Sequence, residues 1–124
     1  METQVGALFT QSPIGMALLE LDGRLRRANA SLQDVLGYSE AELAGRHLSL
    51  CLHPQDASGF VQELQGLAEG RAGVLEQDLR FFRKDGASGW LRFTASLLRD
   101  SAGRPRLVFA LGKDVTRWKH SERQ

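Results

Sequence analysis

The hydrophobic pattern of this chain changes period part-way along its length, and that change restricts the fold more than any other feature. In residues 54–69 apolar side chains recur every three or four positions, which predicts a helix with one buried side. The residues expected on this side are Phe60, Val61, Leu64, Leu67 and Ala68. From residue 75 apolar and polar residues alternate, which predicts strands with one buried face. Helix and strands must bury these faces against each other.

The alternating part divides into three strands joined by two turns. We expect strands at residues 75–81, 90–98 and 107–113. The turns lie at Lys84-Asp85-Gly86 and between Asp100 and Pro105, where residues that favour turns are concentrated. Because short turns join antiparallel neighbours, the three strands form a meander.

A hairpin is predicted near the N-terminus. Asp22-Gly23 between two apolar runs is a strong hairpin signal, and it predicts paired strands at residues 16–21 and 25–28. Residues 2–10 have apolar side chains at helical spacing before the first proline and predict a short lead-in helix.

Two short helices are expected between the hairpin and the long helix. Asn29 has a side-chain oxygen that can cap the first of them, and Gly37 is in the usual stop position. Ser39 and Glu42 have the spacing of a capping box, and Gly45 ends the second helix.

The order of elements predicts an α+β fold. The first hairpin and the last meander each have an apolar face, so we expect one five-stranded antiparallel sheet with short helices covering one side. The expected organisation is a lead-in helix at 1–12, the domain at 13–116, and the start of a C-terminal helix at 117–124.

Composition excludes several classes of protein. The 124 residues have the length of one average domain, and 42% hydrophobic with 25% charged residues is typical of a globular protein. No apolar run approaches the roughly 20 residues of a spanning helix, and the N-terminus does not have the pattern of a secretory signal. The single Cys51 excludes an intrachain disulfide and a multi-cysteine metal site. We therefore expect a cytoplasmic domain that does not insert into a membrane.

The net charge of +1 conceals an uneven distribution. Residues 1–79 contain 5 Lys/Arg and 11 Asp/Glu (net −6), whereas residues 80–124 contain 11 and 4 (net +7). The cations of the second part are spread among alternating strand residues, which favours a solvated sheet face that meets acidic helices. We expect no nucleic-acid partner.

Five short motifs follow one another in the order and at the spacing of a known family. They are Asn29-Ala30 with Leu36 to Gly45, His53-Pro54-Gln55-Asp56, Arg83-Lys84-Asp85-Gly86, Trp90, and Asp114-Val115-Thr116. Over about residues 7–119 they resemble a PAS (Per-Arnt-Sim) sensory domain of the PAS/PAC type. The resemblance implies the fold predicted above. It also implies a sensing and dimerising module of bacterial signal transduction, most often attached to a histidine kinase of a two-component system or a diguanylate cyclase.

The resemblance brings two cofactors into consideration. Light-oxygen-voltage members attach flavin through a cysteine three residues after the glycine that matches Gly45, and that position holds Leu48. The matching flavin-binding asparagine and glutamine positions hold Leu91 and Gly112. Haem-binding members commonly use a histidine of the longest helix, and residues 54–69 contain none. We expect no covalent flavin, haem or metal.

The sequence has no recognisable catalytic motif. It has neither a glycine-rich phosphate loop nor a nucleophile elbow. Glu76 and Asp78 share a strand face, and we interpret them as solvated residues opposite Arg92 or Lys84 rather than as paired catalytic carboxylates. We therefore expect this chain not to be an enzyme, although a full-length protein can have a kinase or cyclase output.

Two alternatives are open for the space between sheet and helices. The inward-facing residues of the last three strands line it, and several are small. These residues are Leu79, Phe81, Leu91, Phe93, Ala95, Val108, Ala110 and Gly112. Either they leave a hydrophobic pocket for a small apolar metabolite, or they fill the core. With a filled core the chain is a ligand-free scaffold for dimerisation and protein contact.

The lead-in helix is a candidate dimer interface. Val5, Leu8 and Phe9 form its apolar face, which can pack against the outer face of the sheet. We expect a homodimer formed through these residues; the alternative is that they only cover their own sheet.

The residues Asp114, Val115 and Thr116 are candidates for signal relay. They resemble the family's signalling motif, with valine in place of isoleucine at the centre. Asp114 can hold a basic group or a backbone amide, and Thr116 can cap a new helix. We expect that helix to lead into a covalently linked effector domain beyond Gln124.

Overall fold

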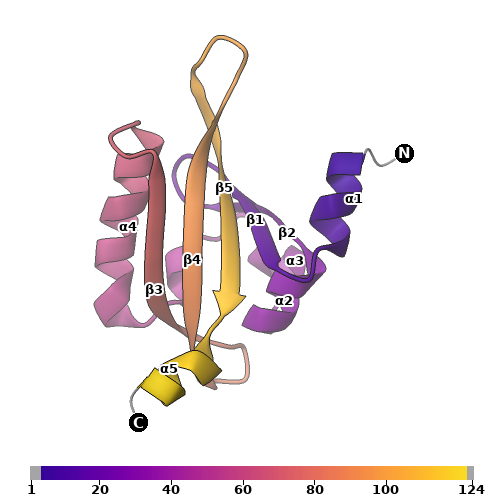
Figure 1. The fold of residues 1–124 in the computed structure, drawn as a ribbon, viewed down its shortest axis with the longest axis vertical. Helices are drawn as coiled ribbons and strands as arrows, with labels where there is room; N and C mark the ends of the chain where they lie inside the picture. Colours follow the sequence, from indigo (N-terminus) through magenta and orange to yellow (C-terminus); the bar gives the residue numbers. More distant parts are fainter. Residues whose placement is uncertain (1–3, 123–124) are drawn as a thin grey trace.

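The fold consists of one antiparallel sheet and a layer of helices on one of its faces (Figure 1). The computed structural model describes residues 4–122, with the side chains of residues 6–119. The five strands have the order β2-β1-β5-β4-β3. They are β1 Gly15–Leu19, β2 Leu25–Ala28, β3 Val74–Phe82, β4 Ser88–Arg99 and β5 Pro105–Asp114. The predicted α+β class and five-stranded sheet are confirmed.

The helices fall into two groups. The described elements are α1 Gln4–Gln11, α2 Ala30–Leu36, α3 Glu40–Leu43, the 3-10 helix η1 Leu48–Cys51, α4 Pro54–Ala68 and α5 Thr116–Glu122. The helices between β2 and β3 belong to the layer that covers the sheet, whereas α1 and α5 stand apart from that layer (Figure 1). Within residues 4–122 no helix is both long and apolar enough to cross a membrane.

The helix caps predicted from the sequence are present as hydrogen bonds in the structure. Oδ1 of Asn29 accepts from the backbone N–H of Leu32 (3.0 Å), and Gly37 ends α2 in the left-handed conformation (φ 79°). Ser39 and Glu42 form both bonds of the capping box at α3. These caps satisfy backbone groups that each helix leaves without internal partners. The chain can therefore place two very short helices beside the sheet.

The strand register places the predicted inward-facing residues on one face. Leu79 pairs with Leu91, and Ala95 pairs with Ala110. Side chains at paired positions of neighbouring strands lie on the same face of a sheet. This inner face meets α4, where the ring of Phe60 packs edge to face on Phe93 with centroids 5.1 Å apart.

One residue of the long helix differs from the prediction. Val61 was expected on the buried side of α4, but its side chain is 38% exposed. It follows the fully buried Phe60 by one position, which turns it about 100° around the helix. Val61 lines a surface groove instead.

Candidate functional site

The interior space between sheet and helices is nearly filled. All eight residues predicted to line it are buried: Leu79, Phe81, Leu91, Phe93, Ala95, Val108, Ala110 and Gly112. Next to Ala110 and Gly112 a cavity of about 10 Å³ remains, closed on the helix side by Leu32 and Leu48. That is about the space required for a single water. Leu32 and Leu48 from the helices occupy most of the space that the small residues Ala110 and Gly112 leave.

Leu48 and Cys51, the residues at and near the flavin-attachment position, are both buried. Leu48, which occupies the cysteine position of light-oxygen-voltage proteins, is 4% exposed and lines the residual cavity. Cys51 is a buried free thiol, and burial raises its pKa. It borders a separate pocket of about 60 Å³ beside Glu42 and Arg46.

The outer face of the sheet has a continuous apolar strip. Met16 pairs with Leu111, and Leu18 pairs with Phe109, so these four half-buried side chains lie on the face away from the helix layer. We call these residues, together with Leu107, the outer strip. A half-buried apolar surface of this kind is typical of a contact surface.

The α1 helix lies next to the outer strip. Between the helix and β1 is a groove of about 690 Å³ lined by Ala7, Leu8, Gln11, Ser12, Pro13 and Met16. Leu8 is 69% exposed, which is a large fraction for a leucine in a helix. The groove and the outer strip share Met16 and therefore form one surface.

Polar contacts connect α1 to the domain. The side-chain amide of Asn29 donates to the carbonyls of Phe9 (2.9 Å) and Ile14 (3.0 Å). The guanidinium of Arg27 lies over the Phe9 ring, 5.4 Å from its centroid. Phe9 is thus half-buried, unlike Leu8. The side chain of Val5, the third predicted contact residue, lies outside the described residues.

The end of β5 forms a compact joint around Asp114. Oδ1 of Asp114 accepts from the backbone N–H of Thr116 (2.9 Å) and from its hydroxyl (2.5 Å), and Oδ2 accepts from Arg83 (2.5 Å). Burial opposes ionisation of Asp114, but the Thr116 hydrogen bonds and the Arg83 charge outweigh it. The pKa of Asp114 is therefore lowered.

Thr116 has a different role from the predicted cap. Its hydroxyl accepts from the backbone N–H of Trp90 (3.0 Å), so it connects α5 to β4. Val115 adds a second connection, because its N–H donates to the carbonyl of Trp90 (2.9 Å) and its side chain is buried. The oxygen at the start of α5 comes from Asp114 instead, since Thr116 is itself the first helical residue.

A clamp between Lys119 and Asp78, which the sequence pattern did not predict, holds α5 against the sheet beside the predicted Arg92–Asp78 pair. Nζ of Lys119 lies 2.8 Å from Oδ2 of Asp78 and 5.0 Å from the Trp90 ring centroid. Arg92 donates to both oxygens of Asp78 (2.9 and 3.1 Å). Hydrogen bonds from Arg92 and then Lys119 lower the pKa of Asp78 to about 2. Lys84, the other predicted partner, instead pairs with Glu42 across the surface (2.5 Å).

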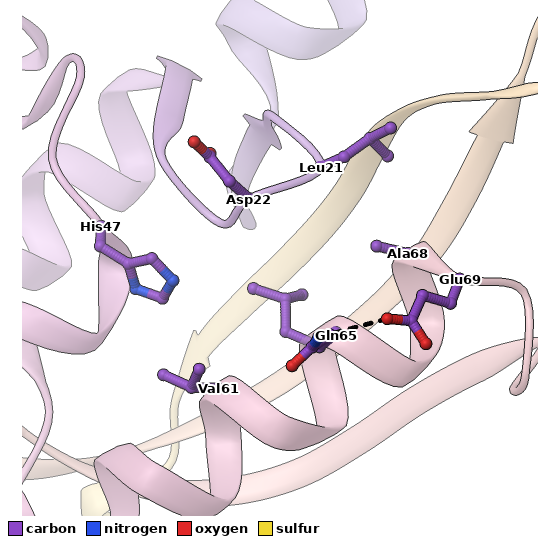
Figure 2. A pocket seen from close by; sticks show the side chains of 8 residues that line it. Leu21, Asp22, His47, Val61, Gln65, Ala68 and Glu69 are labelled. Atoms are coloured by element: carbon purple, nitrogen blue, oxygen red, sulfur yellow. Dashed lines mark hydrogen bonds between the residues drawn. The ribbon is translucent and has the colours of Figure 1, made fainter.

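A second groove lies on the helix side of the molecule, between the β1–β2 turn and α4. We call it the lateral groove; its volume is about 550 Å³. Figure 2 shows the turn residues and His47 on one side and the α4 side chains on the other. The lining residues are Leu21, Asp22, His47, Val61, Leu64, Gln65, Ala68 and Glu69. Of the α4 residues predicted to be buried, Val61 is exposed, and it lines this groove. The apolar pattern of the sequence did not distinguish Val61 from the buried residues of the helix.

Comparison with known proteins identifies the family of this chain. Residues 9–120 match the sequence model of the PAS fold. The chain belongs to the PAS family. Two curated signalling proteins contain a similar segment: a probable diguanylate cyclase, DgcE of Escherichia coli (29% identical over 121 residues), and the sensor histidine kinase TmoS of Ectopseudomonas mendocina (22% identical over 121 residues). Each match covers 98% of this chain but only 11% and 12% of those proteins.

Solved structures agree on the fold of this PAS domain. The PAS domain of a Colwellia psychrerythraea protein has a TM-score of 0.83 at 19% identity, covering 92% of this chain and 96% of that one. A domain of a sensory box sensor histidine kinase/response regulator from Geobacter sulfurreducens has a TM-score of 0.74 at 17% identity, covering 87% and 89%. An RNA-binding light-oxygen-voltage receptor matches with a TM-score of 0.79 at 23% identity, covering 93% of this chain and 33% of that one.

Among the described residues, no three His, Cys, Asp or Glu side chains lie close enough to hold a metal ion.

Proposed function

We propose that this PAS domain is a self-associating relay module. A second copy of the domain binds to the surface formed by the groove beside α1 and the outer strip. This binding changes the position of β5, and the Asp114 joint passes that movement to an effector domain that follows α5. The observation that carries this proposal is the exposed Leu8 beside an apolar groove that continues into the sheet face.

The composition of the contact surface supports pairing with another protein surface. The outer strip consists of Met16, Leu18, Leu107, Phe109 and Leu111, all half-buried. These five side chains and Leu8 bring methionine, leucine and phenylalanine together on two adjacent strands and one helix. The cores of protein interfaces are low in charge and rich in aromatic residues and methionine.

The interior favours the ligand-free form of this function. The remaining cavity of about 10 Å³ is far below the roughly 300 Å³ at which ligand pockets begin. A small metabolite would have to displace Phe93 or Leu91, which are 2% and 1% exposed. The filled core therefore supports a scaffold that acts through protein contact.

A single strand connects the contact surface to the joint. Phe109 and Leu111 belong to β5, and three residues beyond Leu111 the same strand ends at Asp114. A partner that fixes β5 from outside restricts the strand that positions Asp114, Val115 and α5. The histidine kinase and diguanylate cyclase among the relatives indicate the kind of effector that would receive this signal.

The self-association is tested by the mass of the protein in solution. We expect light scattering to give twice the chain mass for the wild type and the single chain mass for Leu8→Asp. Leu8 is preferred to Phe9 because Phe9 packs under Arg27 and its loss would disturb α1 itself. The matched control is Leu50→Asp, a 73% exposed leucine on η1, which should remain dimeric. A monomeric wild type, or a dimeric Leu8→Asp protein, would contradict the proposal.

A further inference from the structure

We propose that the lateral groove binds a small organic cation with an apolar body, such as an arylalkylamine. The groove volume of about 550 Å³ lies within the range of roughly 300–1,000 Å³ for ligand pockets. Its size contrasts with the nearly filled interior of the same domain.

The floor of the lateral groove is apolar. Leu64 of α4 is 2% exposed and Val61 is 38% exposed, and Leu21 on the opposite side of the groove is 36% exposed. Ala68 completes this surface on α4. A flat apolar body placed on these side chains would remove exposed hydrocarbon from water, which favours binding.

The lateral groove is closed toward the interior. The imidazole of His47 packs edge to face on Phe60 with centroids 6.5 Å apart, and Phe60 packs in the same way on Phe93. Of these three rings only His47 lines the groove, and Phe60 and Phe93 are buried behind it. A molecule in the groove therefore does not need to open the hydrophobic core.

The charges around the lateral groove select a cation. Its described lining includes the acidic residues Asp22 and Glu69 and contains no lysine or arginine. Asp22 pairs with Arg24 (3.6 Å) and Glu69 pairs with Arg71. The two arginine side chains are 64% and 65% exposed, and ion pairs so exposed to solvent contribute little to stability. An ammonium group bound in the groove can replace them.

His47 forms one wall of the groove. Its Nδ1 accepts a hydrogen bond from the backbone N–H of Ser49 (3.1 Å), which fixes the orientation of the ring. The ring lies against Gly23, where an added Cβ would be only 2.2 Å from Nε2. Glycine in the β1–β2 turn is therefore required for this wall of the groove.

Phenethylamine and its neutral analogue 2-phenylethanol distinguish charge recognition from apolar contact. In a titration followed by two-dimensional amide NMR, we expect phenethylamine to give saturable shifts at Asp22, Gln65 and Glu69. Its affinity should exceed that of 2-phenylethanol at least tenfold. The double variant Asp22→Asn, Glu69→Gln should lose this tenfold preference, while Glu63→Gln, an exposed residue of α4 outside the groove, should keep it.

Three outcomes would overturn the proposal. Equal affinities for the amine and the alcohol would show that the carboxylates do not select the ligand. Shifts confined to Phe93 and Ala110 would place the probe in the interior instead. Shifts that do not saturate at millimolar amine would show that the groove is not a binding site. None of these results depends on self-association, so they leave the proposed relay function to its own test.

Discussion

Arg83 donates a hydrogen bond to Oδ2 of Asp114 at 2.5 Å, across 31 positions of sequence. The same guanidinium donates to the backbone carbonyl of Val35 at the end of α2 (2.6 Å) and lies over the Phe81 ring, 5.5 Å from its centroid. One side chain therefore touches the helix layer, the inner sheet face and the joint where the chain leaves the sheet. A change in any of these three can move Asp114.

The Asp114 carboxylate should stabilise the fold measurably. Asp114→Asn weakens the charged hydrogen bonds to Arg83 and Thr116, and such bonds contribute about 1.5–3 kcal/mol each. Because asparagine keeps part of the geometry, we expect the free energy of unfolding in urea to fall by about 1–2 kcal/mol. Asp34→Asn, an exposed carboxylate on α2, should change it by less than about 0.5 kcal/mol. A loss no larger than that of the control would contradict the role of Asp114.

Acid should weaken the clamp between α5 and the sheet. The folded-state pKa of Asp78 is about 2, below the ordinary value of about 3.9 in an unfolded chain. A lowered pKa contributes stability that is fully present above pH ~4 and is lost as the pH falls toward ~2. Urea unfolding of wild type and Asp78→Asn between pH 2 and 7 should therefore give a stability difference that shrinks in acid. A difference that stays constant over this range would exclude the ionised clamp.

Gly89 is expected to be intolerant of a side chain. An added Cβ there would lie 2.7 Å from Oγ1 of Thr116 and 2.9 Å from the Phe81 ring. Gly89→Ala should thus displace the Thr116 contact to β4 and lower the free energy of unfolding by about 1–3 kcal/mol. Gly59→Ala is the matched control, since this α4 glycine has nothing within 4 Å and alanine favours the helix by up to about 1 kcal/mol. Thermal unfolding of both variants measures the difference in their stabilities. Equal changes in the melting temperature of the two variants would contradict the predicted clash at Gly89.

The filled interior can be tested by emptying it. Phe93→Ala removes a buried ring and should lower the free energy of unfolding by about 3–5 kcal/mol. The resulting cavity is apolar and should bind benzene, which would raise the melting temperature of Phe93→Ala but not that of the wild type. A wild-type protein stabilised by benzene to the same extent would mean that the interior is not filled.

Local signals of this chain predicted most of the fold. Asn29, Ser39 with Glu42, and Gly37 act through neighbours three or four positions away, so their bonds follow from sequence spacing alone. The inner face of the sheet follows from alternation, because a strand that starts at Leu75 places Leu79 and Phe81 on the same side.

Contacts between distant segments could not be read in this way. Lys119 contacts Asp78 because β3, β4 and α5 meet at one end of the sheet. From the sequence alone, Lys84 was an equally acceptable partner for the acidic strand face, but in the structure it pairs with Glu42. The groove beside α1 depends on how Asn29 binds the carbonyl of Phe9, a contact across 20 positions. Whether the interior is filled depended on Leu32 and Leu48, which belong to helices rather than to the predicted lining strands.

The central claim is that self-association at the outer strip and the conformation of the exit joint are coupled through β5. Hydrogen–deuterium exchange of wild type and Leu8→Asp at equal concentration tests it most directly. The amide of Val115 donates to Trp90 and that of Lys119 donates to Val115, so both are protected when the joint is intact. We predict faster exchange at these two amides in monomeric Leu8→Asp, with Leu50→Asp like the wild type. Equal exchange at Val115 and Lys119 in a dimeric wild type and a monomeric variant would contradict the account.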